Sequence, residues 1–144
     1  MIRQANKYDK TEVIEIIKEC YRQEQFETQI SLDNDEYYEK LFASILAGCG
    51  VIFIEEGKGV LVAIINPSAF DPKTLVMNCL AWVVKKEHRN KFVSYRLIKA
   101  YIDYAEQLKQ KGKINYYTVN KTSKTPDIDY LKLGFCKADE IWAK

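Results

Sequence analysis

No segment of this 144-residue sequence is apolar for long enough to cross a membrane, since a spanning helix needs roughly 18 or more consecutive apolar residues. The first ten residues, MIRQANKYDK, contain no apolar core segment, so no secretory signal is expected. Repeats, low-complexity tracts and internal linkers are also absent. With 47% apolar and 29% charged residues, the composition is that of a soluble globular protein, and the length predicts a single domain over residues 1–144.

Closely spaced cysteines are missing as well. The four cysteines are scattered without a CxxC pair, and most lie in apolar patterns: Cys20, Cys49, Cys79 and Cys136. This spacing favours reduced, mostly buried residues of a cytoplasmic protein over a disulfide framework or a zinc site. We therefore expect no metal.

The net charge is small, at +2, which argues against a dedicated nucleic-acid-binding protein. The charges are unevenly distributed, because residues 85–144 contain 14 Lys and Arg against 7 Asp and Glu, a net of +7, which leaves −5 for residues 1–84. The basic part suits an anionic ligand, and the acidic part could attract a cation. Ordinary solvated faces explain both charges equally well.

The apolar residues change their period along the chain, and this change predicts the order of the elements. A period of 3.6 residues predicts helices over 10–23, from Asp33 or Asp35 to Gly48, over 93–108 and over 126–133. Apolar runs with a period of two, or with none, predict strands over 2–5, 51–56, 60–67, 74–84, 114–119 and 140–144. The run 74–84 is apolar at both alternations, so it should be a central strand covered on both faces. Asp9 and Glu12 form a plausible capping pair for the first helix. This order predicts one α/β domain with a mixed sheet.

The stretch WVVKKEHRNKFVSYRL, residues 82–97, runs from an apolar strand through a basic turn into the third helix. The first turn of a helix presents unpaired N–H groups and the positive end of its dipole, which together stabilise an anion such as a pyrophosphate. Four cations surround this point: Lys85, Lys86, Arg89 and Lys91. Glycines, which let a backbone approach phosphate closely, are absent, and Ser94 is the best substitute. From these residues alone, an anion cradle and a plain charged turn both remain open.

Two longer segments carry a resemblance to a known family. EHRNKFVSYRLIKAYIDYAEQLKQKG contains an arginine, a turn and a long helix in succession, and DYLKLGFCKADEIWAK contains Tyr-x-x-Leu-Gly-Phe before a last strand. With the element order, they make nearly the whole chain similar to the GNAT superfamily of acyl-CoA-dependent N-acetyltransferases. The closest likeness is to compact members encoded by bacteriophages, which share the aromatic-Val strand end and the Arg-Leu pair of the helix. The resemblance implies an α/β fold with a mixed, mostly antiparallel central sheet flanked by helices on both faces.

The same resemblance implies acetyl-CoA as the cosubstrate and assigns residues to it. Arg89 stands at the family's arginine and Ser94 where its second glycine or alanine usually stands, whereas Asn90 and Phe92 replace the usual glycines. Backbone N–H groups at the splayed end of the fourth strand would hold the pantetheine arm and polarise the thioester carbonyl. The implied cofactor-binding residues are Trp82, Val83, Val84, Arg89, Asn90, Lys91, Phe92, Val93 and Ser94.

In the family an amine attacks the thioester directly, and a nearby hydroxyl protonates the departing thiolate. Tyr130 stands at the family's tyrosine, four residues before Gly134, and on a helix it would face the gap between the fourth and fifth strands. The resemblance therefore implies Tyr130 as the catalytic acid. The alternative is an ordinary amphipathic tyrosine, one of ten in the chain.

A general base is harder to identify. Many family members use a glutamate of the fourth strand, where this chain has Asn78 and Cys79. Carboxylates elsewhere could serve instead, among them Glu24, Glu55, Glu56 and Glu87, or the amine is already partly neutral. His88, the only histidine, is better explained as a residue of the basic turn than as a base. The acidic segment 33–40 either attracts a cationic acceptor or is a solvated helix cap.

Three functions remain on this evidence. The first is an N-acetyltransferase that acts on a primary amine of a small molecule or of a protein. The second is a non-catalytic module that keeps the fold and binds CoA or a protein partner, because the cofactor turn lacks glycines and the fourth strand lacks a carboxylate. The third and weakest, a nucleic-acid accessory protein, rests only on the basic half. Edge strands and aromatic residues are compatible with a homodimer.

Overall fold

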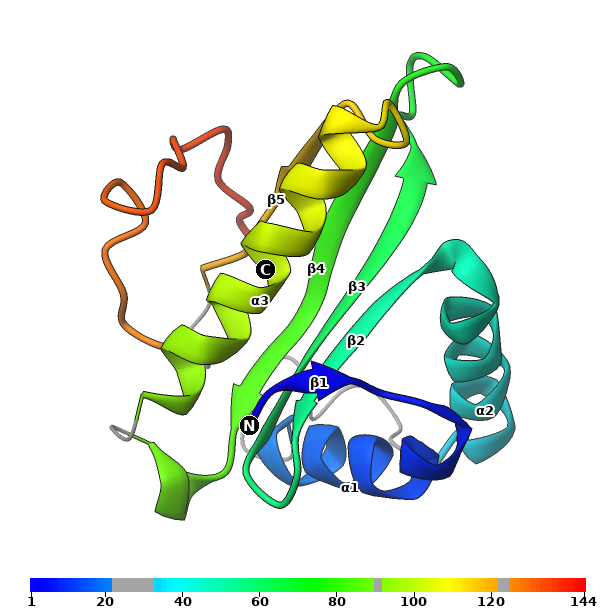
Figure 1. The fold of residues 1–144 in the computed structure, drawn as a ribbon, viewed down its shortest axis with the longest axis vertical. Helices are drawn as coiled ribbons and strands as arrows, with labels where there is room; N and C mark the ends of the chain where they lie inside the picture. The colour runs from blue at the N-terminus through cyan, green and yellow to red at the C-terminus, as the bar shows by residue number, and fades with distance from the viewer. Residues whose placement is uncertain (22–32, 90–91, 122–124) are drawn as a thin grey trace.

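The structure is a computed structural model that describes residues 1–21, 33–89, 92–121 and 125–144. Its centre is a sheet of five strands in the spatial order β1-β2-β3-β4-β5 (Figure 1). The strands are β1 (Arg3–Gln4), β2 (Gly50–Glu55), β3 (Gly59–Pro67), β4 (Leu75–Val84) and β5 (Tyr116–Thr118). Neighbouring strands are antiparallel except β4 and β5, which are parallel. The predicted mixed, mostly antiparallel sheet is confirmed.

Helices cover both faces of the sheet, as predicted. The described helices are α1 (Lys10–Tyr21), α2 (Asp35–Ser44) and α3 (Val93–Gln110), with shorter helical turns at η1 (Lys7–Asp9), η3 (Ile45–Cys49) and η4 (Lys86–His88). Figure 1 shows α3 stretched along β4, with α1 and α2 on the side of β1 and β2.

Alternate residues of the strands point into one of two cores. The core under α3 includes Val51, Phe53, Leu61, Ala63, Leu97, Ile98, Tyr101 and Ala105. The core under α1 and α2 includes Val13, Ile16, Cys20, Phe42, Ile45, Ile52, Ile54, Val60 and Val62. β4 contributes side chains to both, which confirms it as a central strand covered on two faces. Each fully buried aliphatic side chain stabilises the fold by about 1.5–3 kcal/mol.

A β-bulge in β4 determines which side chains face α3 at the end of the strand. Cys79 pairs with Ala63, but the next paired residue is Ala81, so Leu80 is an extra residue without a partner in the ladder. An extra residue reverses the alternation of everything beyond it. Cys79 before the bulge and Trp82 after it therefore both lie in the core under α3.

The first helical segment begins one turn earlier than predicted. The Asn6 side chain accepts a hydrogen bond from the Tyr8 N–H at 2.9 Å, and the Asp9 carboxylate accepts one from the Asn6 N–H at 2.7 Å. These bonds form a capping box around η1. Glu12, the expected partner of Asp9, instead accepts a hydrogen bond from the Gly57 N–H in the β2–β3 turn. The predicted Asp9–Glu12 capping pair is wrong, because Asp9 already ends the preceding helical turn.

The helix predicted over 126–133 is wrong, because this segment contains only a single turn. The Phe135 N–H donates to the Tyr130 carbonyl at 3.0 Å, and Gly134 takes a φ of 93°, which favours glycine. So short a segment gains few helical hydrogen bonds against the cost of nucleation, and this disfavours a full helix.

The strand predicted over 140–144 does not join the described sheet. Ile141 and Trp142 are 90% and 86% exposed. The tendency of such a pattern to form a strand depends on the packing of its side chains against neighbours, and these two side chains lie almost entirely in solvent. Figure 1 shows this C-terminal segment, coloured orange to red, looping outside β5 and α3.

Candidate active site

The end of β4 extends past β5, and this leaves part of its backbone open. β5 ends at Thr118, which pairs with Asn78, whereas β4 continues to Val84. The Tyr101 hydroxyl from α3 lies at the base of the resulting fork, 2.8 Å from the Thr118 carbonyl oxygen and 3.2 Å from that of Met77. Beyond this point no strand of the described chain pairs with β4 on the β5 side.

The backbone groups of β4 alternate in direction along this open end. The Lys85 N–H donates to the Lys58 carbonyl at 2.8 Å, and hydrogen-bonded pairs alternate with non-bonded pairs in an antiparallel ladder. The pair of Val83 with its β3 partner is therefore hydrogen-bonded. Trp82 and Val84 direct their N–H and C=O groups away from β3, toward the open side of the strand.

The basic turn after β4 is held by hydrogen bonds from its own residues. The Arg89 Nε donates to the Val84 carbonyl at 3.1 Å, so the guanidinium folds back over the end of β4. The His88 N–H donates to the Lys85 carbonyl at 2.9 Å within η4. Asn90 and Lys91, two of the predicted cofactor-binding residues, lie outside the described residues.

Phe92 adopts the backbone conformation that a glycine would favour. Its φ of 63° and ψ of 4° are left-handed, and among the described residues it is the only one other than glycine with positive φ. This conformation costs a residue with a Cβ about 1–2 kcal/mol. The Phe92 side chain is 76% exposed, so little burial offsets that cost. The backbone thus follows a path typical of a glycine turn although the residue here is a phenylalanine.

α3 begins directly after this residue. The Arg96 N–H makes the first helical hydrogen bond, to the Phe92 carbonyl at 3.0 Å, and the Phe92 side chain caps none of the first-turn N–H groups. Val93 is buried against the sheet and Ser94 is half-buried. These N–H groups and the helix dipole form a position suited to an anion.

The C-terminal turn places Tyr130 beside the open end of β4. The ring centroids of Trp82 and Tyr130 are 6.2 Å apart, and Phe135 packs edge-on against Tyr130 with centroids 6.4 Å apart. That Tyr130 faces the gap between the fourth and fifth strands stays a prediction, and no helix carries the residue. Burial raises the pKa of Tyr130, against a smaller lowering by the Thr125 side chain. Its hydroxyl therefore carries its proton at neutral pH.

The middle of β4 offers no proton acceptor for an ammonium group. The Thr118 hydroxyl donates to Asn78 Oδ1 at 2.9 Å, and Asn120 Nδ2 donates to the Cys79 carbonyl at 3.2 Å. Burial raises the pKa of the Cys79 thiol to about 12, so it stays a neutral thiol at physiological pH.

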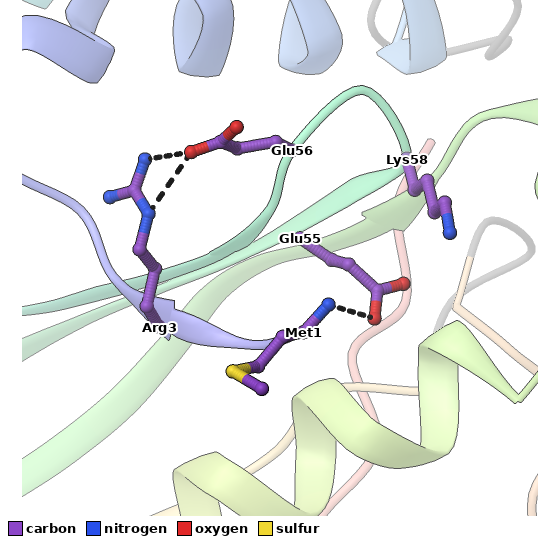
Figure 2. Close-up of a pocket in the computed structure, with 5 residues that line it drawn as sticks. All are labelled: Met1, Arg3, Glu55, Glu56 and Lys58. Atoms are coloured by element: carbon purple, nitrogen blue, oxygen red, sulfur yellow. Dashed lines mark hydrogen bonds and ion pairs between the residues drawn. The ribbon is translucent and has the colours of Figure 1, made fainter.

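Glu55 is held as an anion by other groups, which removes it from the candidate bases. Its buried carboxylate accepts two hydrogen bonds from Arg96, each of 2.8 Å. The Met1 amino group lies 3.3 Å from Glu55 Oε1 (Figure 2). The Arg96 hydrogen bonds lower the pKa of Glu55, although burial acts in the opposite direction. The neighbouring Glu56 is paired with Arg3 (Figure 2).

A cavity of about 290 Å³ lies beside these groups. It is lined by Met1, Arg3, Glu55, Glu56 and Lys58 (Figure 2). The lining residues lie at the start of the chain and in β1, and at the end of β2 and in the β2–β3 turn. The cavity borders the start of α3, because Glu55 is bound by Arg96 of its first turn, but its lining includes neither Trp82 nor Tyr130.

The other candidate carboxylates lie in solvent or in ion pairs. Glu87 is exposed on η4, and Glu24 lies outside the described residues. The acidic residues of α2 form ion pairs with lysines: Asp35–Lys18, Glu36–Lys40 and Glu39–Lys10. This favours a solvated helix start over an acceptor-recruiting patch for that segment.

In the part of the chain that the structure describes, no three His, Cys, Asp or Glu side chains gather where they could hold a metal ion. No helix in the same residues has the length and apolar character needed to cross a bilayer.

The profile of the Acetyltransferase (GNAT) family matches residues 11–135. Because this is most of the sequence, the chain belongs to that family. Among curated proteins, no sequence match is found. The likeness to members encoded by bacteriophages therefore remains a prediction.

Solved structures of acetyltransferases share the fold. Glucosamine-6-phosphate N-acetyltransferase from Arabidopsis thaliana superposes with a TM-score of 0.69 at 16% identity, covering 100% of this chain and 96% of that one. A predicted acetyltransferase from Clostridium acetobutylicum, solved with acetyl-CoA, gives 0.69 at 17% identity, covering 100% and 94%. AAC(6')-Iy, solved with a bisubstrate analogue of CoA and acetylneamine, gives 0.65 at 16% identity, covering 100% and 95%. At such identities the likeness establishes the fold alone.

Proposed function

We propose that this protein is an N-acetyltransferase that moves an acetyl group from acetyl-CoA to a primary amine of a small molecule or of a protein. The observation that carries the proposal is the junction between β4 and α3. There, Trp82 and Val84 have backbone groups that face away from β3. The chain then enters α3 through Phe92, whose backbone is left-handed. Membership in the GNAT family supports the reaction class.

The residues of the junction fit a cofactor with an extended arm and a pyrophosphate. The N–H groups of Trp82 and Val84 are the donors for the carbonyl groups of the arm, because both face the open side of β4. The first-turn N–H groups of α3, including that of Ser94, and the Arg89 guanidinium are the donors for the pyrophosphate. Acetyl-CoA, when bound, supplies the activated thioester.

Tyr130 is the proton donor in this proposal. The amine nitrogen forms the new bond to the acyl carbon as the carbon–sulfur bond breaks. The Tyr130 hydroxyl gives its proton to the sulfur, and the proton that the amine nitrogen loses passes through solvent and restores the Tyr130 phenolate to the hydroxyl. The raised pKa of Tyr130 keeps its hydroxyl protonated at neutral pH, which a proton donor requires, although it also makes the hydroxyl a weaker acid. We assign no residue as the base: an acceptor amine that is already neutral needs none before it attacks, and the proton that it sheds as the amide forms is taken by solvent.

A non-catalytic CoA-binding module is the second candidate. It is favoured by the chemistry of β4, where Asn78 is engaged with Thr118 and the Cys79 thiol stays neutral. Such a module would bind CoA at the same junction and release no free thiol with any amine.

Titration calorimetry with acetyl-CoA tests the shared part of both functions. We expect micromolar binding by the wild type and none by the double variant Arg89→Glu/Ser94→Glu. The control is Lys109→Glu/Gln110→Glu, which makes the same change of −3 charges at the other end of α3. Equal loss of affinity in both variants, or no binding by the wild type at millimolar acetyl-CoA, would contradict the proposed site.

An amine screen then separates the enzyme from the binding module. Glucosamine 6-phosphate, aminoglycosides and a lysine peptide are suitable first acceptors, with release of free CoA thiol as the readout. Cys49 and Cys136 are exposed, so a blank without acetyl-CoA is needed to subtract their reaction with the thiol reagent.

We also place the protein in the reducing cytoplasm and expect no nucleic-acid partner. None of the four cysteines is in a disulfide, which supports such a compartment. The free edge of β5 and the exposed Ile141 and Trp142 support a homodimer, which sedimentation analysis would test.

A further inference from the structure

Trp82 is a deeply buried polar side chain at the candidate active site. The residue is 1% exposed, and its indole Nε1 has no hydrogen-bond partner among the residues that the structure describes. An indole nitrogen can only donate, so no rotation about the ring turns it into an acceptor. A buried donor without a partner is uncommon and costs free energy, so an acceptor on a bound ligand would stabilise it.

The position of the indole follows from the bulge at Leu80. Without that extra residue, the alternation of β4 would direct the Trp82 side chain to the face of α1 and α2. With it, the ring lies in the core under α3. It is there beside Tyr130, at a centroid separation of 6.2 Å. The Trp82 ring, which carries the unpartnered N–H, and the Tyr130 ring therefore lie together beside the open end of β4.

We propose that the Trp82 indole N–H donates a hydrogen bond to the thioester arm of CoA. This role belongs to the side chain and adds to the backbone contact proposed for the same residue. The inference rests on the proposed function, because it needs CoA to lie along the open end of β4. The hydrogen-bond acceptors on that arm are its amide carbonyls, the thioester carbonyl and the sulfur. The nucleotide end of CoA lacks these three kinds of group.

Nuclear magnetic resonance of the uniformly ¹⁵N-labelled full chain tests this without any change to Trp82. The sequence has two tryptophans, so the spectrum has two indole N–H signals, and Trp142→Phe identifies which one belongs to Trp82. On saturation with CoA or acetyl-CoA, we expect the Trp82 signal to move downfield, as a donor does when it gains an acceptor. Trp142 is 86% exposed, and its signal should stay in place.

Adenosine 3′,5′-bisphosphate serves as the matched ligand that lacks the thioester arm. It should leave the Trp82 signal where it is in the free protein. An unmoved signal with saturating CoA overturns the inference, and so does an equal shift with the bisphosphate. If the wild type binds no CoA at all, the proposed function itself fails, so the two failures are distinguishable.

The variant Trp82→Phe gives a second, independent measurement. Loss of one neutral hydrogen bond should raise the Kd for CoA by about three- to tenfold. The Kd for adenosine 3′,5′-bisphosphate should not change. A purely structural role for the indole predicts that both constants change together or that neither does, and either of those results contradicts the proposal.

Discussion

The carboxylate of Glu55 and the guanidinium of Arg96 form a two-pronged ion pair, with both contact distances at 2.8 Å. Glu55 ends β2, and Arg96 lies in the first turn of α3, four residues after Phe92. The pair therefore ties the central sheet to the helix start at which we propose that pyrophosphate binds. Because the Glu55 side chain is only 3% exposed, the arginine is the main compensation for a buried charge.

Arg96→Ala should lower the stability of the fold more than Lys99→Ala, a truncation of another basic residue on α3. It leaves the Glu55 carboxylate buried beside the weaker Met1 contact, and we expect the free energy of unfolding to fall by about 3 kcal/mol. Lys99→Ala is the control, because it breaks only the exposed Lys99–Asp103 pair on the same helix, which is worth about 0.5 kcal/mol or less. Urea denaturation at pH 7 measures both. Similar losses in the two variants would show that the buried pair is energetically unimportant.

The same pair predicts a pH dependence of stability. The pKa of Glu55 in the folded chain is lowered from its ordinary 4.5. Its contribution is therefore complete above pH 4.5 and is lost as the pH falls through the lower value of the folded state. We expect Glu55→Gln to be clearly less stable than the wild type at pH 7, and the difference to shrink steadily below pH 4.5. Denaturation midpoints measured from pH 7 to pH 3 test this, and a gap that stays constant with pH would contradict it.

Phe92→Gly should stabilise the protein, against the usual effect of introducing glycine. The left-handed backbone at this position costs a residue with a Cβ about 1–2 kcal/mol, and glycine avoids that cost. Part of the gain is offset by the greater freedom of glycine in the unfolded chain, so we expect a net gain of about 0.5–1 kcal/mol. Phe70→Gly is the control, since Phe70 is fully exposed and has no positive φ. It should be neutral or destabilising in the same thermal or urea unfolding experiment.

Local patterns in the sequence predicted those parts of the fold that depend on one segment at a time. The burial of β4 on both faces and the apolar face of α3 followed directly from apolar spacing. The bulge at Leu80 could not be predicted, because the register of β4 depends on its partner strand. The residues of β4 before and after Leu80 are mostly apolar, so their pattern does not show where the alternation reverses.

At the candidate site, contacts between residues far apart in the sequence could not be predicted. Glu55 and Arg96 are 41 positions apart, and no pattern within either segment indicates that they pair. The expected helix over 126–133 and strand over 140–144 failed for a related reason. Their periodicity was correct for those elements, but both a short helix and a strand need their apolar side chains to pack against the rest of the chain. Tyr130 nevertheless lies near Trp82, because the turn closed by Gly134 directs it there.

Tyr130→Phe should separate catalysis from binding. Removing the hydroxyl takes away the proposed proton donor but keeps the ring that packs on Trp82 and Phe135. We therefore expect kcat with any accepted amine to fall by about 100-fold, the lower range for general acid catalysis, with the Kd for acetyl-CoA unchanged. Tyr8→Phe, an 83% exposed tyrosine, is the control and should leave kcat unaltered.

The pH profile gives this prediction a second readout. Because burial raises the pKa of Tyr130 above its ordinary value of 10, the hydroxyl stays protonated throughout the range from pH 7 to pH 9. Any loss of kcat that titrates within that range must then come from another group, and it should persist in Tyr130→Phe. A variant that retains kcat within about threefold of the wild type would assign the tyrosine a packing role only. In that case the departing sulfur takes its proton from water or leaves as a thiolate.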